Sequence, residues 1–201
     1  MNKLLKGLSA KQRLAVEKIG FGGILYMDIT TVPTMLGLWL VNNYNYHSNT
    51  LNVGTHTIKI TPELIRDVLG IPMGDVEVTN VERPSNSYAI IRQWRKHVNF
   101  FSKLPLVGGI VNFITESNDC GMMFLQSFLV VFITIMGEVK KSSTCNMAWL
   151  PSLTGNVSIH QMNWCAYLLD CLNKTKRKWS GTERYNGPLV LLAVFTLSNI
   201  V

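Results

Sequence analysis

Charged residues are scarce in this sequence. Only 15% of its 201 residues are Asp, Glu, Lys or Arg, whereas 47% are hydrophobic. Such a balance excludes a wholly disordered chain, which needs high charge and low hydrophobicity. A chain of this length is also long enough to bury a real core. We therefore expect one folded domain whose surface is either unusually apolar or covered by a partner.

Acidic residues are scarcer still. The chain has 12 Asp and Glu against 19 Lys and Arg, so its formal net charge is +7. A basic balance allows a polyanionic partner such as nucleic acid or an acidic membrane surface, but it serves solubility equally well. Charge alone leaves these alternatives open.

The sequence also lacks targeting and membrane-spanning segments. Its first 20 residues contain five Lys and Arg and no apolar core of a secretory signal. The four cysteines are therefore expected to be reduced thiols. The longest apolar run falls short of the roughly 20 residues that a bilayer requires. We expect no membrane partner and a location outside the secretory pathway, in the cytoplasm unless other features indicate the nucleus.

Patterns that carry catalysis or bind cofactors are missing as well. The segment Gly20–Gly23 has neither the third glycine of a dinucleotide fingerprint nor the Gly-Lys-Ser/Thr of a phosphate loop, so a closely packed turn is expected there. His160, Cys165 and Cys171 do not have the spacing of a metal site. We predict no catalytic residue, no cofactor and no metal. A cysteine and a histidine that are distant in the sequence but meet in the fold would instead indicate a degenerate enzyme.

One long apolar stretch organises the rest of the chain. It runs from Gly121 to Gly137, and its only polar side chains are Gln126, Ser127 and Thr134. A segment that is apolar nearly all round is typical of a helix buried on most sides. We predict a mainly α domain packed around this central helix, at about residues 119–137, because other helices must cover it.

The remaining chain supplies those covers. Alternation on both sides of Gly54 predicts one small β-hairpin at about residues 50–60. Thr61, Pro62 and Gly70 are the start and stop signals of a short helix that follows it. Apolar spacing predicts further helices at 8–19, 31–41, 86–101, 158–179 and 188–201. The last has no capping residue, so we expect residues 1–201 to form a single domain that is truncated at its C-terminus.

The second of these helices has a broad apolar face. We expect this face to be formed by Met35, Leu36, Leu38, Trp39, Leu40 and Val41. The polar, aromatic run from Asn42 to His47 follows it. Such a run can stack on nucleic-acid bases, although it is more often a helix end that meets a turn.

Two basic clusters are the candidate nucleic-acid site. The first lies opposite the apolar stripe of the helix at 86–101, and the second ends the helix at 158–179; their members are Arg92, Arg95 and Lys96, and Lys174, Lys176, Arg177 and Lys178. The first cluster is also consistent with a solvated outer face. The second is typical of a nuclear-import or nucleic-acid patch, and it is equally consistent with the lysine-rich end of a helix, since cations there complement the helix dipole.

Several segments together resemble a known family. They are residues 20–23, 38–41, 58–72, 158–165 and 187–192, of which Thr61 to Pro72 is the most specific. Their order and spacing are similar to the plant mobile domain, also called aminotransferase-like plant mobile domain, and to its relatives in plant transposon-derived proteins. The resemblance implies a mostly helical, non-catalytic, nuclear domain, and in some relatives a link to transposon silencing and genome maintenance.

The function expected from these observations is a non-enzymatic interaction module with an unidentified protein partner. The alternative is sequence-tolerant nucleic-acid binding through the two basic clusters. The two functions differ in a measurable way, because phosphate binding weakens steeply with salt.

Overall fold

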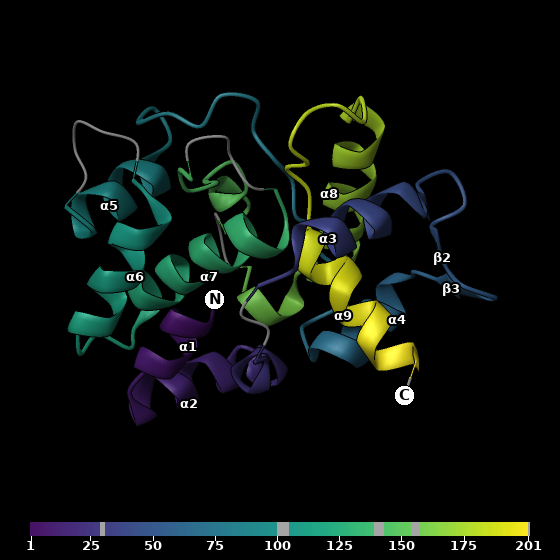
Figure 1. Cartoon of the computed structure of the whole chain (residues 1–201). Coiled ribbons are helices and arrows are strands. Elements are labelled where there is room, and N and C mark those ends of the chain that lie inside the picture. Colours follow the sequence, from purple (N-terminus) through teal and green to yellow (C-terminus); the bar gives the residue numbers. More distant parts are fainter. Residues whose placement is uncertain (29–30, 100–104, 139–142, 154–156, 201) are drawn as a thin grey trace.

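The computed structural model describes residues 1–28, 31–99, 105–138, 143–153 and 157–200. This part of the chain is mainly helical, as predicted, with one small sheet (Figure 1). Its elements, in chain order, are α1 (Asn2–Gly7), α2 (Ala10–Lys18), η1 (Gly22–Tyr26), α3 (Thr34–Asn42), β1 (Tyr44–Asn45), β2 (Thr50–Val53), β3 (His56–Lys59), α4 (Pro62–Leu69), α5 (Ala89–His97), α6 (Val107–Glu116), α7 (Met122–Met136), η2 (Leu150–Leu153), η3 (Ile159–Gln161), α8 (Trp164–Lys178) and α9 (Leu189–Ile200).

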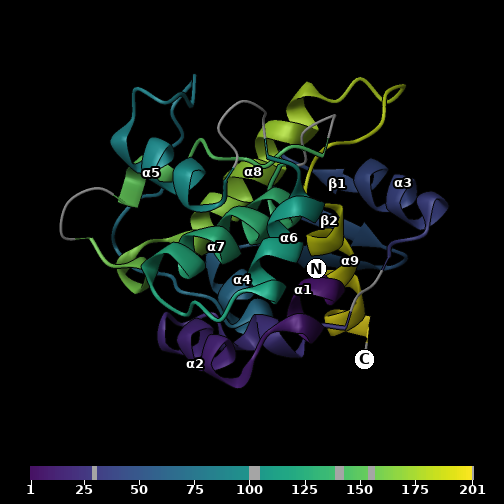
Figure 2. The ribbon, with the colours of Figure 1, turned by 90° about the vertical axis from the view of Figure 1, so that its left-hand side faces the viewer.

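Helix α7 is the centre of the fold, which confirms the predicted central helix. Twelve of its 15 residues are buried, and helices α2, α5, α6 and α9 pack against it. Figures 1 and 2 show it surrounded by other elements in two perpendicular views. Phe21 lies edge-on to Phe132 with ring centroids 5.3 Å apart. This geometry is favourable for aromatic pairs.

Two of the three polar side chains of α7, Ser127 and Thr134, have hydrogen-bond partners inside the core, whereas the buried Oε1 of Gln126 has none among the described residues. Ser127 accepts a hydrogen bond of 3.0 Å from the indole Nε1–H of Trp94. Thr134 donates to the carbonyl of Val130 and accepts a bond of 2.8 Å from the backbone N–H of Asn146. Because a buried polar group without a partner costs free energy, these bonds make Ser127 and Thr134 compatible with the burial of α7.

The predicted hairpin at residues 50–60 is confirmed as β2 and β3. These strands pair antiparallel with Leu51 opposite Ile58, and Gly54 has the positive φ of 59° that a tight turn requires. A third strand, β1, pairs with β2 and was not predicted. It consists of two residues, too few for an alternating pattern.

Three segments that carry the family resemblance lie against one another. A Cβ atom on Gly23 would lie 2.3 Å from the carbonyl oxygen of Leu69, and one on Gly20 would lie 2.9 Å from the ring of Pro72. The thiol of Cys165, on α8, is 3.6 Å from the carbonyl oxygen of Pro72. The segment at 20–23 is therefore a closely packed turn against the end of α4, which agrees with the structural interpretation of its glycines.

Several predicted boundaries were wrong. Helices α1 and α6 were not predicted. The helix expected from residue 158 begins at Trp164, because Ser158 and Gln161 form a capping box that starts the short helix η3 instead. The helix expected at 86–101 ends at His97; residues 100 and 101 lie outside the described residues.

Candidate interaction site

Helix α3 exposes several of the large side chains that were expected to form its apolar face. Met35 is 76% exposed, Leu36 41%, Leu38 42% and Trp39 40%. We call these four residues the α3 surface. The opposite side of the helix, with Gly37, Leu40 and Val41, is buried. The helix has apolar residues on every side, so one buried face leaves the others uncovered.

Two contacts fix α3 on the domain. It packs on α9, and Gly37 lies so close that a Cβ atom there would be 2.7 Å from a methyl of Leu189. At its C-terminal end, the ammonium group of Lys176 donates a hydrogen bond of 2.7 Å to the carbonyl oxygen of Val41. This bond satisfies a carbonyl that a helix end leaves without an intrahelical partner. The α3 surface is therefore presented by an anchored helix.

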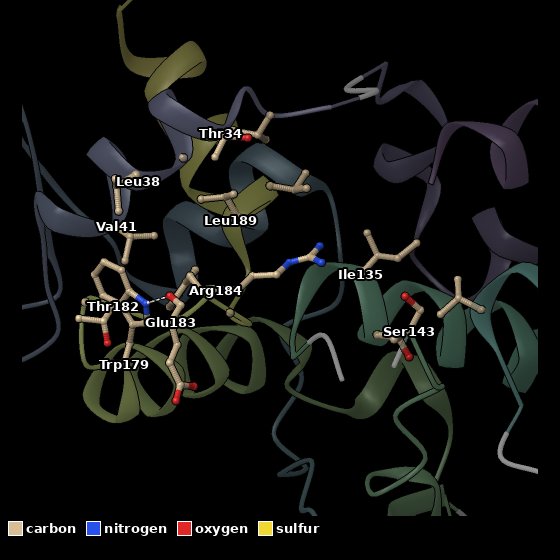
Figure 3. Close-up of a pocket in the computed structure, with 18 residues that line it drawn as sticks. Thr34, Leu38, Val41, Ile135, Ser143, Trp179, Thr182, Glu183, Arg184 and Leu189 are labelled. Atoms are coloured by element: carbon tan, nitrogen blue, oxygen red, sulfur yellow. Dashed lines mark hydrogen bonds between the residues drawn. The ribbon is translucent and has the colours of Figure 1, made fainter. Parts of the chain in front are cut away.

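A groove lies beside the α3 surface, and we call it the α3–α9 groove. Its volume is about 760 Å³. Thr34, Leu38 and Val41 of α3 form one wall, and Leu189 and Val190 contribute from α9. The opposite wall is the loop between α8 and α9, and Ile135 near the end of α7 also lines the groove (Figure 3). Leu38 belongs to both the groove and the α3 surface, so the two form one continuous apolar region.

The loop that forms the second wall is held by side-chain contacts. The indole of Trp179 donates a hydrogen bond of 2.7 Å to the carbonyl of Glu183, and the hydroxyl of Tyr185 lies 3.0 Å from that of Thr175. Burial raises the pKa of Tyr185 to about 12. Tyr185 is therefore a neutral hydroxyl at physiological pH, and it adds no charge to the groove.

The second basic cluster lies at the end of α8, next to this groove. Lys174 forms an ion pair of 2.6 Å with Asp170. Lys176 is half-buried, lies 4.8 Å from the centroid of the Trp179 ring, and has a pKa lowered by desolvation. Arg177 and Lys178 are exposed. Two of the four cations thus make intramolecular contacts that stabilise the fold.

The first basic cluster lies elsewhere. Arg92 donates a hydrogen bond to the backbone carbonyl of Asn86, and Arg95 donates one of 3.0 Å to its side chain. Lys96 is exposed. Figure 1 shows α5 and α8 far apart, on different sides of α7. The structure does not bring the seven predicted cations together into one nucleic-acid surface.

The polar run at 42–47 ends α3 and enters strand β1, as expected of a helix end that meets a turn. A second pocket of about 360 Å³ lies here, lined by Asn42, Asn43, Tyr44, Asn45, Tyr46, Asn52 and Lys176. The ring of Tyr46 lies against that of His47, with centroids 4.0 Å apart. In this pocket the structure joins the aromatic run to the second basic cluster.

A family model described as "Domain of unknown function (DUF8566)" matches residues 1–193. The chain belongs to the DUF8566 family. No curated protein and no solved structure matches it.

The thiols of this DUF8566 chain are poor nucleophiles where they are buried. Burial raises the pKa values of Cys145, Cys165 and Cys171 to about 12, and the reactive form of cysteine is the thiolate. Cys120 is exposed. Within the described residues, no three His, Cys, Asp or Glu side chains are grouped as a metal site would require.

Across the same described ranges, no helix has both the length and the apolar character needed to cross a bilayer.

The loop from Trp179 to Gly187, with Arg184, is the part of the site that sequence analysis missed. It contains no motif, and its importance arises only because it faces α3, which is more than 130 residues earlier in the chain. The only available signal was that residues 38–41 and 187–192, which both contribute to the groove, belong to the segments that carry the family resemblance.

Proposed function

We propose that this chain is a non-enzymatic interaction module that binds a polypeptide through the α3 surface and the adjoining α3–α9 groove. One observation carries the proposal. Helix α3 is anchored on one side and exposes Met35, Leu36, Leu38 and Trp39 on the others. Contiguous exposed apolar side chains on a soluble domain mark interaction sites.

The chemistry of the α3 surface supports a protein partner. Trp and Met are enriched in the cores of protein interfaces, where charged residues are depleted. All four residues of the α3 surface are uncharged, and Trp39 supplies the type of side chain that most often dominates binding energy. The groove beside them offers the concave surface in which an apolar side chain of a partner is well packed.

The cellular setting is part of the same proposal. The resemblance of residues 20–23, 58–72 and 158–165 to the plant mobile domain supports a nuclear protein derived from a mobile element. In this setting the partner would connect the module to transposon silencing or genome maintenance.

Position-specific photo-crosslinking tests the proposal in cells that express the chain. A photo-reactive phenylalanine derivative replaces Met35 in one variant and Leu14 in another. Leu14 is 50% exposed on α2 and is the matched control. We expect a crosslinked protein from position 35 that is absent from position 14 and is lost when Leu38→Glu is added. Identical crosslinks from both positions, or crosslinks that Leu38→Glu leaves unchanged, would contradict the proposal.

Sequence-tolerant nucleic-acid binding is the second candidate. One observation favours it: the aromatic pocket at residues 42–46 contains Lys176, which is followed in the chain by the exposed Arg177 and Lys178. Fluorescence anisotropy with labelled DNA and RNA across a salt series separates the candidates. Affinity that falls steeply with salt and disappears in Arg177→Glu/Lys178→Glu supports this function. The absence of binding by the folded protein at low salt excludes it.

A further inference from the structure

One cation faces the α3–α9 groove without an acidic partner. The side chain of Arg184 extends across the groove towards Ile135, as Figure 3 shows. Its neighbour Glu183 also lines the groove, but in the same view its carboxylate points away from the guanidinium group of Arg184. Among the described residues, no carboxylate forms an ion pair with Arg184. The guanidinium group therefore has its donors available to a ligand that enters the groove.

The surroundings of Arg184 are positive as well. The last turn of α8 leads directly into the loop that carries Arg184, and it ends with Lys176, Arg177 and Lys178. The other lysine of that helix end, Lys174, is already neutralised by Asp170. Clustered charge of one sign raises the local concentration of ligands of the opposite sign and repels ligands of the same sign.

The remaining lining of the groove is largely apolar. Leu38, Val41, Ile135, Leu189 and Val190 line it, and its volume of about 760 Å³ lies within the range of about 300–1,000 Å³ that is usual for ligand cavities. Because Leu38 connects the groove to the α3 surface, a ligand that fills the groove can continue along α3. This shape suits a polypeptide, whose side chains can occupy both regions.

We infer that the α3–α9 groove binds an amphipathic polypeptide segment that carries acidic residues. Apolar side chains of the segment lie in the groove and on the α3 surface, and one carboxylate forms a two-point hydrogen-bonded ion pair with Arg184. Guanidinium and carboxylate groups match in this geometry, and an amphipathic helix in an apolar groove is a recurrent mode of recognition. The inference rests on the proposed function and names the chemistry of its partner.

A peptide display selection tests it with a defined probe. Random peptides of about 15 residues, which span roughly four helical turns, are selected on the purified full chain. We expect the selected peptides to combine Asp or Glu with apolar residues at helical spacing. Their affinities are then measured by fluorescence anisotropy for the wild type, Arg184→Glu and Arg83→Glu.

The two substitutions change the net charge equally, and only their positions differ. Arg83 is exposed in the connection between α4 and α5. We expect Arg184→Glu to weaken peptide binding by about tenfold or more, the effect of losing roughly 1.4 kcal/mol. Arg83→Glu should change it by less than about twofold, since a distant surface charge is screened. Circular dichroism checks that each variant is folded.

The outcomes separate this inference from the proposed function. Selection of no peptide, selection of peptides without acidic residues, or equal binding to Arg184→Glu and the wild type overturns the inference. If a crosslink from position 35 is nevertheless seen and is lost with Leu38→Glu, the proposed function is supported, and its partner is recognised by a different chemistry. If that crosslinking also fails, both proposals fall.

Discussion

Helices α7 and α3 are both built almost entirely from apolar residues, yet they are buried to different extents. Helix α7 buries 12 of its 15 residues under several neighbouring helices. Helix α3 buries three of nine and leaves Met35, Leu36, Leu38 and Trp39 exposed. Ser127 and Thr134 of α7 are hydrogen-bonded inside the core, whereas the polar residues at the ends of α3 face solvent.

The difference lies in how many neighbours reach each helix. Exposing an apolar side chain forgoes about 25 cal/mol for each Å² that burial would remove from water. Four exposed apolar side chains on one helix therefore leave apolar surface whose burial by a partner would favour binding. The comparison therefore indicates that α7 stabilises the fold, and it supports the binding proposed for α3; the predictions below test this division.

The largest contrast is expected from truncating one side chain in each helix. Phe132→Ala in α7 should lower the free energy of unfolding by about 3–5 kcal/mol, because it leaves a cavity against Phe21 in a fully buried site. Met35→Ala in α3 should change it by less than about 0.5 kcal/mol. Urea unfolding measures both changes in the free energy of unfolding, provided that the m-value is the same in each variant. Similar costs at the two positions would refute the division of roles.

The pH dependence of stability tests how well the cysteine thiols of the core are buried. Cys171 lies near the end of that helix, at 3.5 Å from where a Cβ of Gly137 would be. Burial raises the pKa of Cys145, Cys165 and Cys171 from 9.0 to about 12. Each raised pKa contributes stability that is complete below about pH 9 and is lost as the pH rises towards 12. The loss is about 1.4 kcal/mol per pH unit for each thiol.

Urea unfolding between pH 8 and pH 11 measures this decline. Thiol labelling at pH 8 provides a second readout: the exposed Cys120 should react in the folded protein, and the other three only after unfolding. Rapid labelling of all four cysteines in the native state would show that the core thiols are accessible to solvent.

Sequence analysis succeeded where composition or a local signal decides the structure. Helix α7 was predictable because a segment that is apolar all round must be buried. Helix α4 was predictable from its ends: Thr61 accepts a hydrogen bond from the N–H of Leu64, and Gly70 adopts a φ of 58°. Both signals act within a few residues and need no knowledge of the tertiary structure.

It failed where neighbours from distant parts of the chain decide. The apolar residues of α3 were identified correctly, but their periodicity does not reveal how many helices cover them. Helix α6 begins with Val107, Gly108 and Gly109, which favour a loop locally, and its packing on α1 and α7 overrides that preference. The groove was missed for a related reason, since it depends on a loop that has no motif.

The smallest of the expected effects concerns the polar groups of α7. Ser127→Ala should cost about 1–3 kcal/mol of stability, because it leaves the indole N–H of Trp94 buried without its acceptor. In a Trp94→Phe background that donor is absent, so the same substitution should cost less than about 1 kcal/mol. Urea unfolding of the wild type, both single variants and the double variant gives the coupling free energy between Trp94 and Ser127. Equal costs in both backgrounds would mean that this hydrogen bond does not stabilise the core, and that α7 tolerates an unpaired polar group as readily as an exposed helix such as α3 does.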